Sequence, residues 1–122
     1  MPVWYDPAAL AIHRRHSASE SSRLLTQGTV WPDLVHAIRI NAESIPRSRQ
    51  ASLVSRSARW YAGSAFRTAM DNLIRGDHDA ARATLAHGRR LIAMITNPKP
   101  RAILEQRASV IERRLSATVR PT

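Results

Sequence analysis

The residues best equipped for chemistry lie near the start of the chain, where Arg14, Arg15 and His16 follow one another. Two guanidinium groups form paired hydrogen bonds with phosphate oxygens, and a neutral imidazole donates a hydrogen bond or ligates a metal ion held by a diphosphate. The triplet could therefore bind an anion. The alternative is an exposed basic loop without a ligand, which is the interpretation we favour for this chain taken alone.

Other polar residues are weaker candidates. The Asp-His-Asp run at 77–79 has the side chains of a metal site, but it follows Gly76 at the expected start of a helix, where carboxylates act as caps. His36, His78 and His87 are expected on different helices without a second ligand at metal spacing, so we predict that they face solvent. No serine stands in a histidine and carboxylate order that indicates a nucleophile. We therefore predict no catalytic residues, no metal ion and no cofactor.

The chain of 122 residues contains 19 Lys and Arg residues against 9 Asp and Glu residues, a formal net charge of +10. This charge favours polyanions such as nucleic acid, an acidic membrane face or a phosphorylated substrate. It identifies none of them, because Lys99 is the one lysine and heavy arginine usage also reflects a GC-rich genome. The absence of cysteine excludes disulfides, thiolate nucleophiles and cysteine zinc sites.

The apolar runs are short and interrupted by arginine, below the ~18 residues that a membrane span needs. Met1-Pro2-Val3-Trp4 does not begin a charged and then apolar signal peptide. We therefore expect a cytoplasmic chain without a membrane span.

Aromatic residues are interleaved with the arginines. Trp4, Trp31, Trp60 and Tyr61 could stack on the bases of a single-stranded nucleic acid. Anchoring in the core is the favoured alternative, because Tyr61 falls on an apolar stripe. We expect the arginines of the long central helix around its circumference rather than along one edge, and no helix-turn-helix pattern accompanies them. These arginines are Arg47, Arg49, Arg56, Arg59 and Arg67.

Residues 1–28 are predicted to be an extended or loop segment, and residues 29–122 a helical domain. Pro2 and Pro7 resist helix, and apolar residues alternate over 10–15 as in a strand that lacks a partner within the chain. A short helix after Pro7 is the open alternative. A serine-rich connector follows.

Four helices are expected in the helical domain. The first is capped by Thr29, has Pro32 in its first turn and ends near Pro46. Its predicted inward stripe is Val30, Leu34, Ala37, Ile38 and Asn41. The last helix follows the breaker at 97–100 and ends before Pro121. Its predicted stripe is Ile103 or Leu104 with Ala108, Ile111 and Leu115.

Between them, a long helix over 48–75 and a second helix over about 78–94 are joined by so few residues that they must fold back antiparallel. Gly76 can close the first helix in a left-handed conformation, and Asp77 or Asp79 can cap the second. Gly63, within the long helix, allows another backbone to approach closely. The predicted stripes are Val54, Ala58, Tyr61, Ala65, Ala69 and Leu73, then Ala81, Leu85, Gly88 and Ile92.

The order of residues from Tyr5 to Leu24 resembles the segment that follows the catalytic core in bacterial family-2 glycosyltransferases. Arg14, His16, Ser19 and Ser21 match its "P-x-x-L-x-x-Y-R-x-H-x-x-S-x-S/T" pattern, although His13 replaces the usual tyrosine. The helical tail is similar too. Asp33, Ala37 and Ile38 match its first helix, and Ala69, Gly76, Asp77 and Ala81 match a tetratricopeptide-like hairpin.

The periodicity and the breakers predict an all-α, four-helix bundle-like array with an extended N-terminal segment. The resemblance implies that Arg14 and His16 lie near the diphosphate of a sugar nucleotide. The Asp-x-Asp metal site and catalytic base of the family are not in this chain. We therefore expect an accessory region that is inactive alone, whose partner is a glycosyltransferase core. The alternatives are a self-associating or peptide-binding helical module and, with less support, a nucleic-acid-binding protein.

Overall fold

The computed structural model describes residues 23–24 and 30–118, and all regular structure in these residues is helical. The predicted all-α array of four packed helices is confirmed. The helices are α2 (Val30–Glu43), α3 (Arg47–Ile74), α4 (His78–Ala93) and α5 (Pro98–Thr118). The extended segment predicted for residues 1–28 lies outside the described residues, except that Arg23 and Leu24 have helical backbone.

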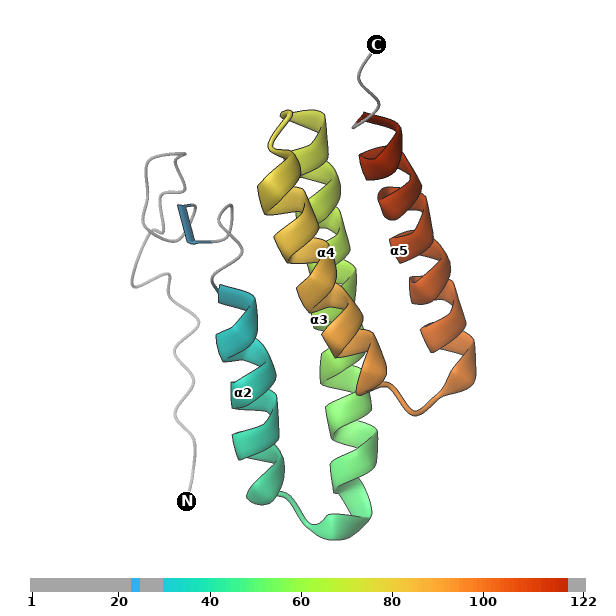
Figure 1. Cartoon of the computed structure of the whole chain (residues 1–122). Helices are drawn as coiled ribbons and strands as arrows, with labels where there is room; N and C mark the ends of the chain where they lie inside the picture. Colours follow the sequence, from blue (N-terminus) through green and yellow to red (C-terminus); the bar gives the residue numbers. More distant parts are fainter. Residues whose placement is uncertain (1–22, 25–29, 119–122) are drawn as a thin grey trace, which may run out of the picture.

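Helices α2 and α3 each pack against the next two helices along the chain. Helix α2 contacts α3 and α4, α3 contacts α4 and α5, and α4 contacts α5. Helices α3 and α4 form the central antiparallel hairpin, and α2 and α5 lie on opposite sides of it (Figure 1). This pattern of contacts is the one that stacked helical repeats form.

The turn of the central hairpin has the predicted chemistry. Gly76 has a φ of 82°, in the left-handed region that favours glycine. The backbone N–H of Asp77 donates to the Asn72 carbonyl oxygen at 2.9 Å, which closes the turn. The Asp77 carboxylate then accepts from the Ala80 N–H at 3.0 Å and caps α4. Gly76 thus forms the turn of the hairpin and Asp77 caps the helix that follows it, as the sequence predicts.

The core of the hairpin is built from small residues on α3. Ala58, Ala62, Ala65 and Ala69 are fully buried and face the likewise buried stripe of α4. The stripe predicted for α4 is confirmed, whereas that of α3 is rotated from the prediction. Val54, Tyr61 and Leu73 are only partly buried, and Ser55, Ala62, Phe66 and Asn72 are buried instead. Helix α3 contacts three other helices, so its buried face is wider than one stripe.

The hairpin packs tightly at Gly88. A Cβ added there would overlap the ring of Phe66, which is itself buried. No described part of this chain makes the close approach that Gly63 was predicted to allow, because nothing lies within 4 Å of a Cβ added at that position. Helix α3 passes through Gly63 without a break.

The outer helices are each anchored by one apolar stripe. In α2 the anchor is Trp31, which is 1% exposed, while the predicted Ala37 and Asn41 are exposed. In α5 the predicted stripe of Leu104, Ala108, Ile111 and Leu115 is buried, with Leu104 rather than Ile103 as its first member. The loop between α4 and α5 is tied back to α3, because the Ser55 hydroxyl accepts from the Thr96 N–H at 3.2 Å.

Within residues 30–118, no helix combines the length and the hydrophobicity that crossing a membrane requires.

Gly88→Ala should destabilise the protein by up to about 2 kcal/mol. Moving the buried Phe66 ring to admit the new methyl group costs about 1–3 kcal/mol, and the gain in helix propensity offsets about 1 kcal/mol of this cost. Urea unfolding measures both. Gly63→Ala is the matched control: its Cβ meets nothing, so the same substitution should stabilise by up to about 1 kcal/mol. Equal effects of the two substitutions would contradict the packing argument.

Candidate functional site

A basic groove runs between α3 and α5. Its volume is about 450 Å³, and both helices contribute arginines and apolar residues to it. The lining residues of α3 recur at steps of three and four, so they share one helical face. We define the basic groove by its residues: Arg56, Arg59, Trp60, Gly63 and Arg67 from α3, and Pro100, Ile103, Leu104 and Arg107 from α5.

The four guanidinium groups of the basic groove are exposed, and they form no ion pair among the described residues. The expectation that the α3 arginines surround the helix was therefore wrong for Arg56, Arg59 and Arg67, which lie along one edge. The sequence carries two signals of this groove. One is the spacing, and the other is the absence of any acidic residue between Glu43 and Asp71.

The aromatic residues divide between the core and this groove. Trp31 anchors α2 in the core, as predicted. Trp60 does not, because 67% of it is exposed in the groove. Its ring meets the ring of Tyr61 edge to face, with the centroids 5.3 Å apart and the planes at 87°. Trp60 is therefore an exposed ring supported on one side by a partly buried one.

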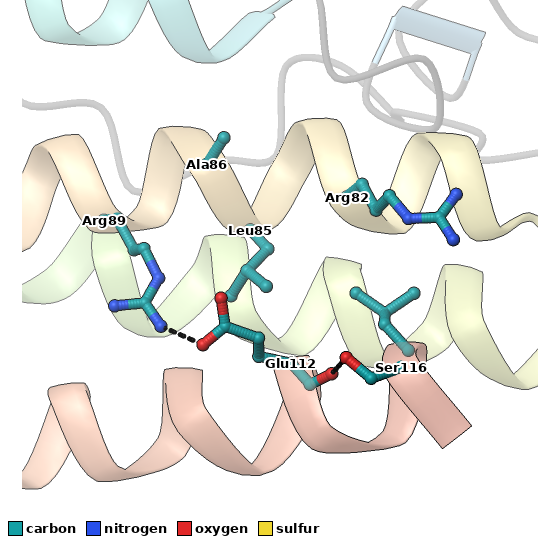
Figure 2. A pocket seen from close by; sticks show the side chains of 7 residues that line it. Arg82, Leu85, Ala86, Arg89, Glu112 and Ser116 are labelled. Carbon is teal, nitrogen blue, oxygen red and sulfur yellow. Dashed lines mark hydrogen bonds and ion pairs between the residues drawn. The ribbon is translucent and has the colours of Figure 1, made fainter. Parts of the chain in front are cut away.

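A second groove, of about 540 Å³, lies between α4 and α5. The buried Leu85 and Leu115 form its apolar floor. Figure 2 shows Leu85 between the two helices. Arg89 Nη2 donates to Glu112 Oε2 at 2.6 Å across the groove. Both side chains are about half exposed, so this pair contributes only about 0.2–1 kcal/mol. We call this hollow the α4/α5 groove.

The histidines form no metal site in the part of the chain that is described, where no cluster of three possible ligands occurs. His36 is exposed on α2. His78 and His87 share α4, contrary to the expectation of different helices, and both are partly buried rather than solvent-facing. The Asp-His-Asp run at 77–79 caps the helix as predicted, and Asp79 pairs with Arg82 at 3.0 Å.

His87 has the most perturbed environment of the described titratable groups. Burial lowers the pKa of its imidazole from the ordinary value of 6.5, and the neighbouring charge of Arg90 adds to the shift. Its Nδ1 is buried without a hydrogen-bond partner among the described residues. The folded chain therefore favours the neutral imidazole.

Arg14 and His16, the residues predicted to bind a nucleotide diphosphate, lie outside the described residues. Arg15 and the serines of the same motif lie outside them as well. The basic groove and the α4/α5 groove, each lined by two helices, are the candidates for ligand binding that we take from the described residues.

Comparisons of this chain with protein-family models, with curated proteins and with solved structures find no match. The resemblance to family-2 glycosyltransferases rests on the residues quoted above.

The fold should lose stability as the pH falls below about 6.5, because the unfolded chain then protonates His87 while the folded chain resists it. The loss should level off below the lowered pKa of the folded state. Unfolding midpoints in urea at pH 7.5 and pH 5.5 measure it. His87→Gln should reduce the difference between the two midpoints. His36→Gln, at an exposed position of α2, should leave that difference unchanged. Equal pH dependence in both variants would contradict the assignment to His87.

Proposed function

We propose that this chain is the helical C-terminal accessory region of a bacterial family-2 glycosyltransferase, which acts in the cytoplasm and has no sugar-transfer activity alone. The observation that carries the proposal is that each residue of the hairpin motif has the structural role that such a hairpin requires. Ala69 and Ala81 are fully buried, Gly76 has the left-handed φ, and Asp77 caps α4. The "A-x-x-x-x-x-x-G-D-x-x-x-A" pattern of the resemblance thus corresponds to a packed and capped helical hairpin.

The segment ahead of the hairpin contains the residues that we propose to contact the substrate. Arg14 and His16 stand in the segment that resembles the one following the catalytic core. A guanidinium group and an imidazole both form charge-assisted hydrogen bonds with phosphate oxygens. In this proposal they hold the diphosphate of the sugar nucleotide, and the catalytic core supplies the remaining chemistry.

Arg14→Ala and His16→Ala should each lower kcat/KM for the sugar nucleotide about ten- to a hundredfold in a protein that joins this chain to its catalytic core. Loss of one charge-assisted hydrogen bond to phosphate costs about 1.5–3 kcal/mol. Sugar transfer and the thermal unfolding midpoint are measured together, and the midpoint should not change.

Arg39→Ala is the matched control, because it removes the same charge from an exposed site on α2. It should leave kcat/KM unchanged. Full activity of both the Arg14 and His16 variants would overturn the diphosphate role, and sugar-nucleotide hydrolysis by this chain alone would overturn the claim of inactivity.

A second candidate function is self-association through the α4/α5 groove. In this array α2 and α3 each pack on the two helices that follow them, so one further helix could pack on α4 and α5 in the same way. The apolar floor of the α4/α5 groove lies where that helix would pack. The proposed occupant is a second copy of this chain.

Ala86→Arg should shift a self-associated species to the monomer, because Ala86 lines the α4/α5 groove and a guanidinium group there blocks an apolar contact. Sedimentation at a range of protein concentrations measures the change. Ala83→Arg adds the same group at an exposed position of α4 outside the groove and should not alter the association. A wild-type chain that stays monomeric at high concentration would refute this candidate.

A further inference from the structure

The arginines of the basic groove form a linear track. Arg56 and Arg67 are eleven residues apart on one unbroken helix, which places their Cα atoms ~16 Å apart along its axis. Arg59 lies between them on the same edge, and Arg107 faces them from α5. At the ~3.4 Å rise of a stacked strand, this track has the length of about five nucleotides.

The groove also provides a ring on which a base can stack. Trp60 is mostly exposed, and the perpendicular contact with Tyr61 restrains the orientation of its indole. Tyr61 is itself partly buried against the core. A ring restrained in this way gives up little rotational freedom when a ligand stacks on it, so binding costs less entropy.

The charges of the groove are available to a ligand without breaking existing pairs. None of its arginines is paired within the described part of the chain, and residues 44–70 contain no acidic side chain. The nearest carboxylate in sequence on α5, that of Glu105, accepts from Arg101 at 3.0 Å. A polyanion therefore meets positive charge along the whole groove.

We propose that the basic groove binds single-stranded nucleic acid, with the four arginines on its phosphates and Trp60 stacked on one base. Ile103, which is 56% exposed, and Leu104 form an apolar side of the groove against which a base can also pack. A ligand that carries planar bases on a chain of phosphates uses every feature of the groove. The two alternative ligands match fewer of these features. A bilayer contacts only those apolar groups that protrude from the surface, and an acidic peptide has no base to stack on Trp60.

Labelled single-stranded oligonucleotides of unrelated sequence test the proposal by fluorescence anisotropy, with the full chain, at salt concentrations from 50 to 200 mM. Binding should weaken steeply with salt, because each neutralised phosphate releases counterions. Arg107→Ala should make the slope of log affinity against log salt shallower by about 0.7. Arg113→Ala removes the same charge from α5 outside the groove and should leave the slope near its wild-type value.

Trp60→Ala should weaken binding about five- to a hundredfold, the range that one base stacked on an aromatic ring accounts for. Trp60→Phe keeps a ring and should retain most of the affinity. Because Trp60 is largely exposed, neither variant should lower the thermal unfolding midpoint, which checks that the fold is intact.

Three results would overturn the proposal: no binding of the oligonucleotide at 50 mM salt, equal losses for Arg107→Ala and Arg113→Ala, or unchanged affinity for Trp60→Ala. Vesicles that contain anionic lipid and a polyglutamate peptide are measured alongside. Tighter binding of either of these, with the same dependence on Trp60, would assign the groove to a membrane surface or an acidic protein instead.

Discussion

The close packing of α4 against α3 is the contact on which the other helices depend. A row of alanines on α3 has no side-chain atoms beyond Cβ, so α4 can pack close to it. Gly88 on α4 leaves room for the Phe66 ring of α3, which a Cβ at that position would overlap. The burial of each alanine contributes little apolar area. The close packing of the helices buries more apolar area indirectly, because it brings Leu85, Leu91 and Ile92 of α4 into one core with Phe66.

This hairpin also determines where the two grooves lie. Helix α5 packs on both α3 and α4, which leaves one hollow on each of its sides. On the α4 side, Leu85 and Leu115 make the hollow apolar, and the Arg89–Glu112 pair crosses it. On the α3 side, Gly63 contributes no side chain, so the hollow stays open between the arginines. The same packing therefore produces one apolar groove and one basic groove.

Much of the fold could be predicted from the sequence because local signals agreed with one another. Gly76 and Asp77 specify the turn of the hairpin by backbone conformation and capping, which depend on near neighbours only. The predicted stripes of α4 and α5 are buried. The predicted stripe of α3 included the large residues Val54, Tyr61 and Leu73, whereas the buried face of that helix is centred on small residues such as Ala62. Apolar periodicity does not show that small residues lie where another helix packs.

The basic groove was harder to predict because it depends on two helices that are distant in sequence. Arg56 and Arg107 lie 51 positions apart, and only the packing of α5 on α3 brings their helices together. Trp60 was expected in the core because its neighbour Tyr61 falls on the predicted stripe, but burial of Ala58 and Ala62 on the same helix turns Trp60 outward. Its exposure follows from a helical register that the sequence-based stripe did not capture.

Arginine is frequent over the whole surface, so a high arginine content does not by itself mark a binding groove. The positions of the acidic residues show which arginines are left without a nearby negative charge. On α4 and α5, Asp79, Glu105 and Glu112 each accept a hydrogen bond from an arginine, so positive charge there is locally offset. The α3 edge of the basic groove has no such partner along 27 consecutive residues, from 44 to 70. Since screening limits electrostatic attraction to about 10 Å at ordinary salt, it is this local imbalance, rather than the net charge of the chain, that a polyanion would detect.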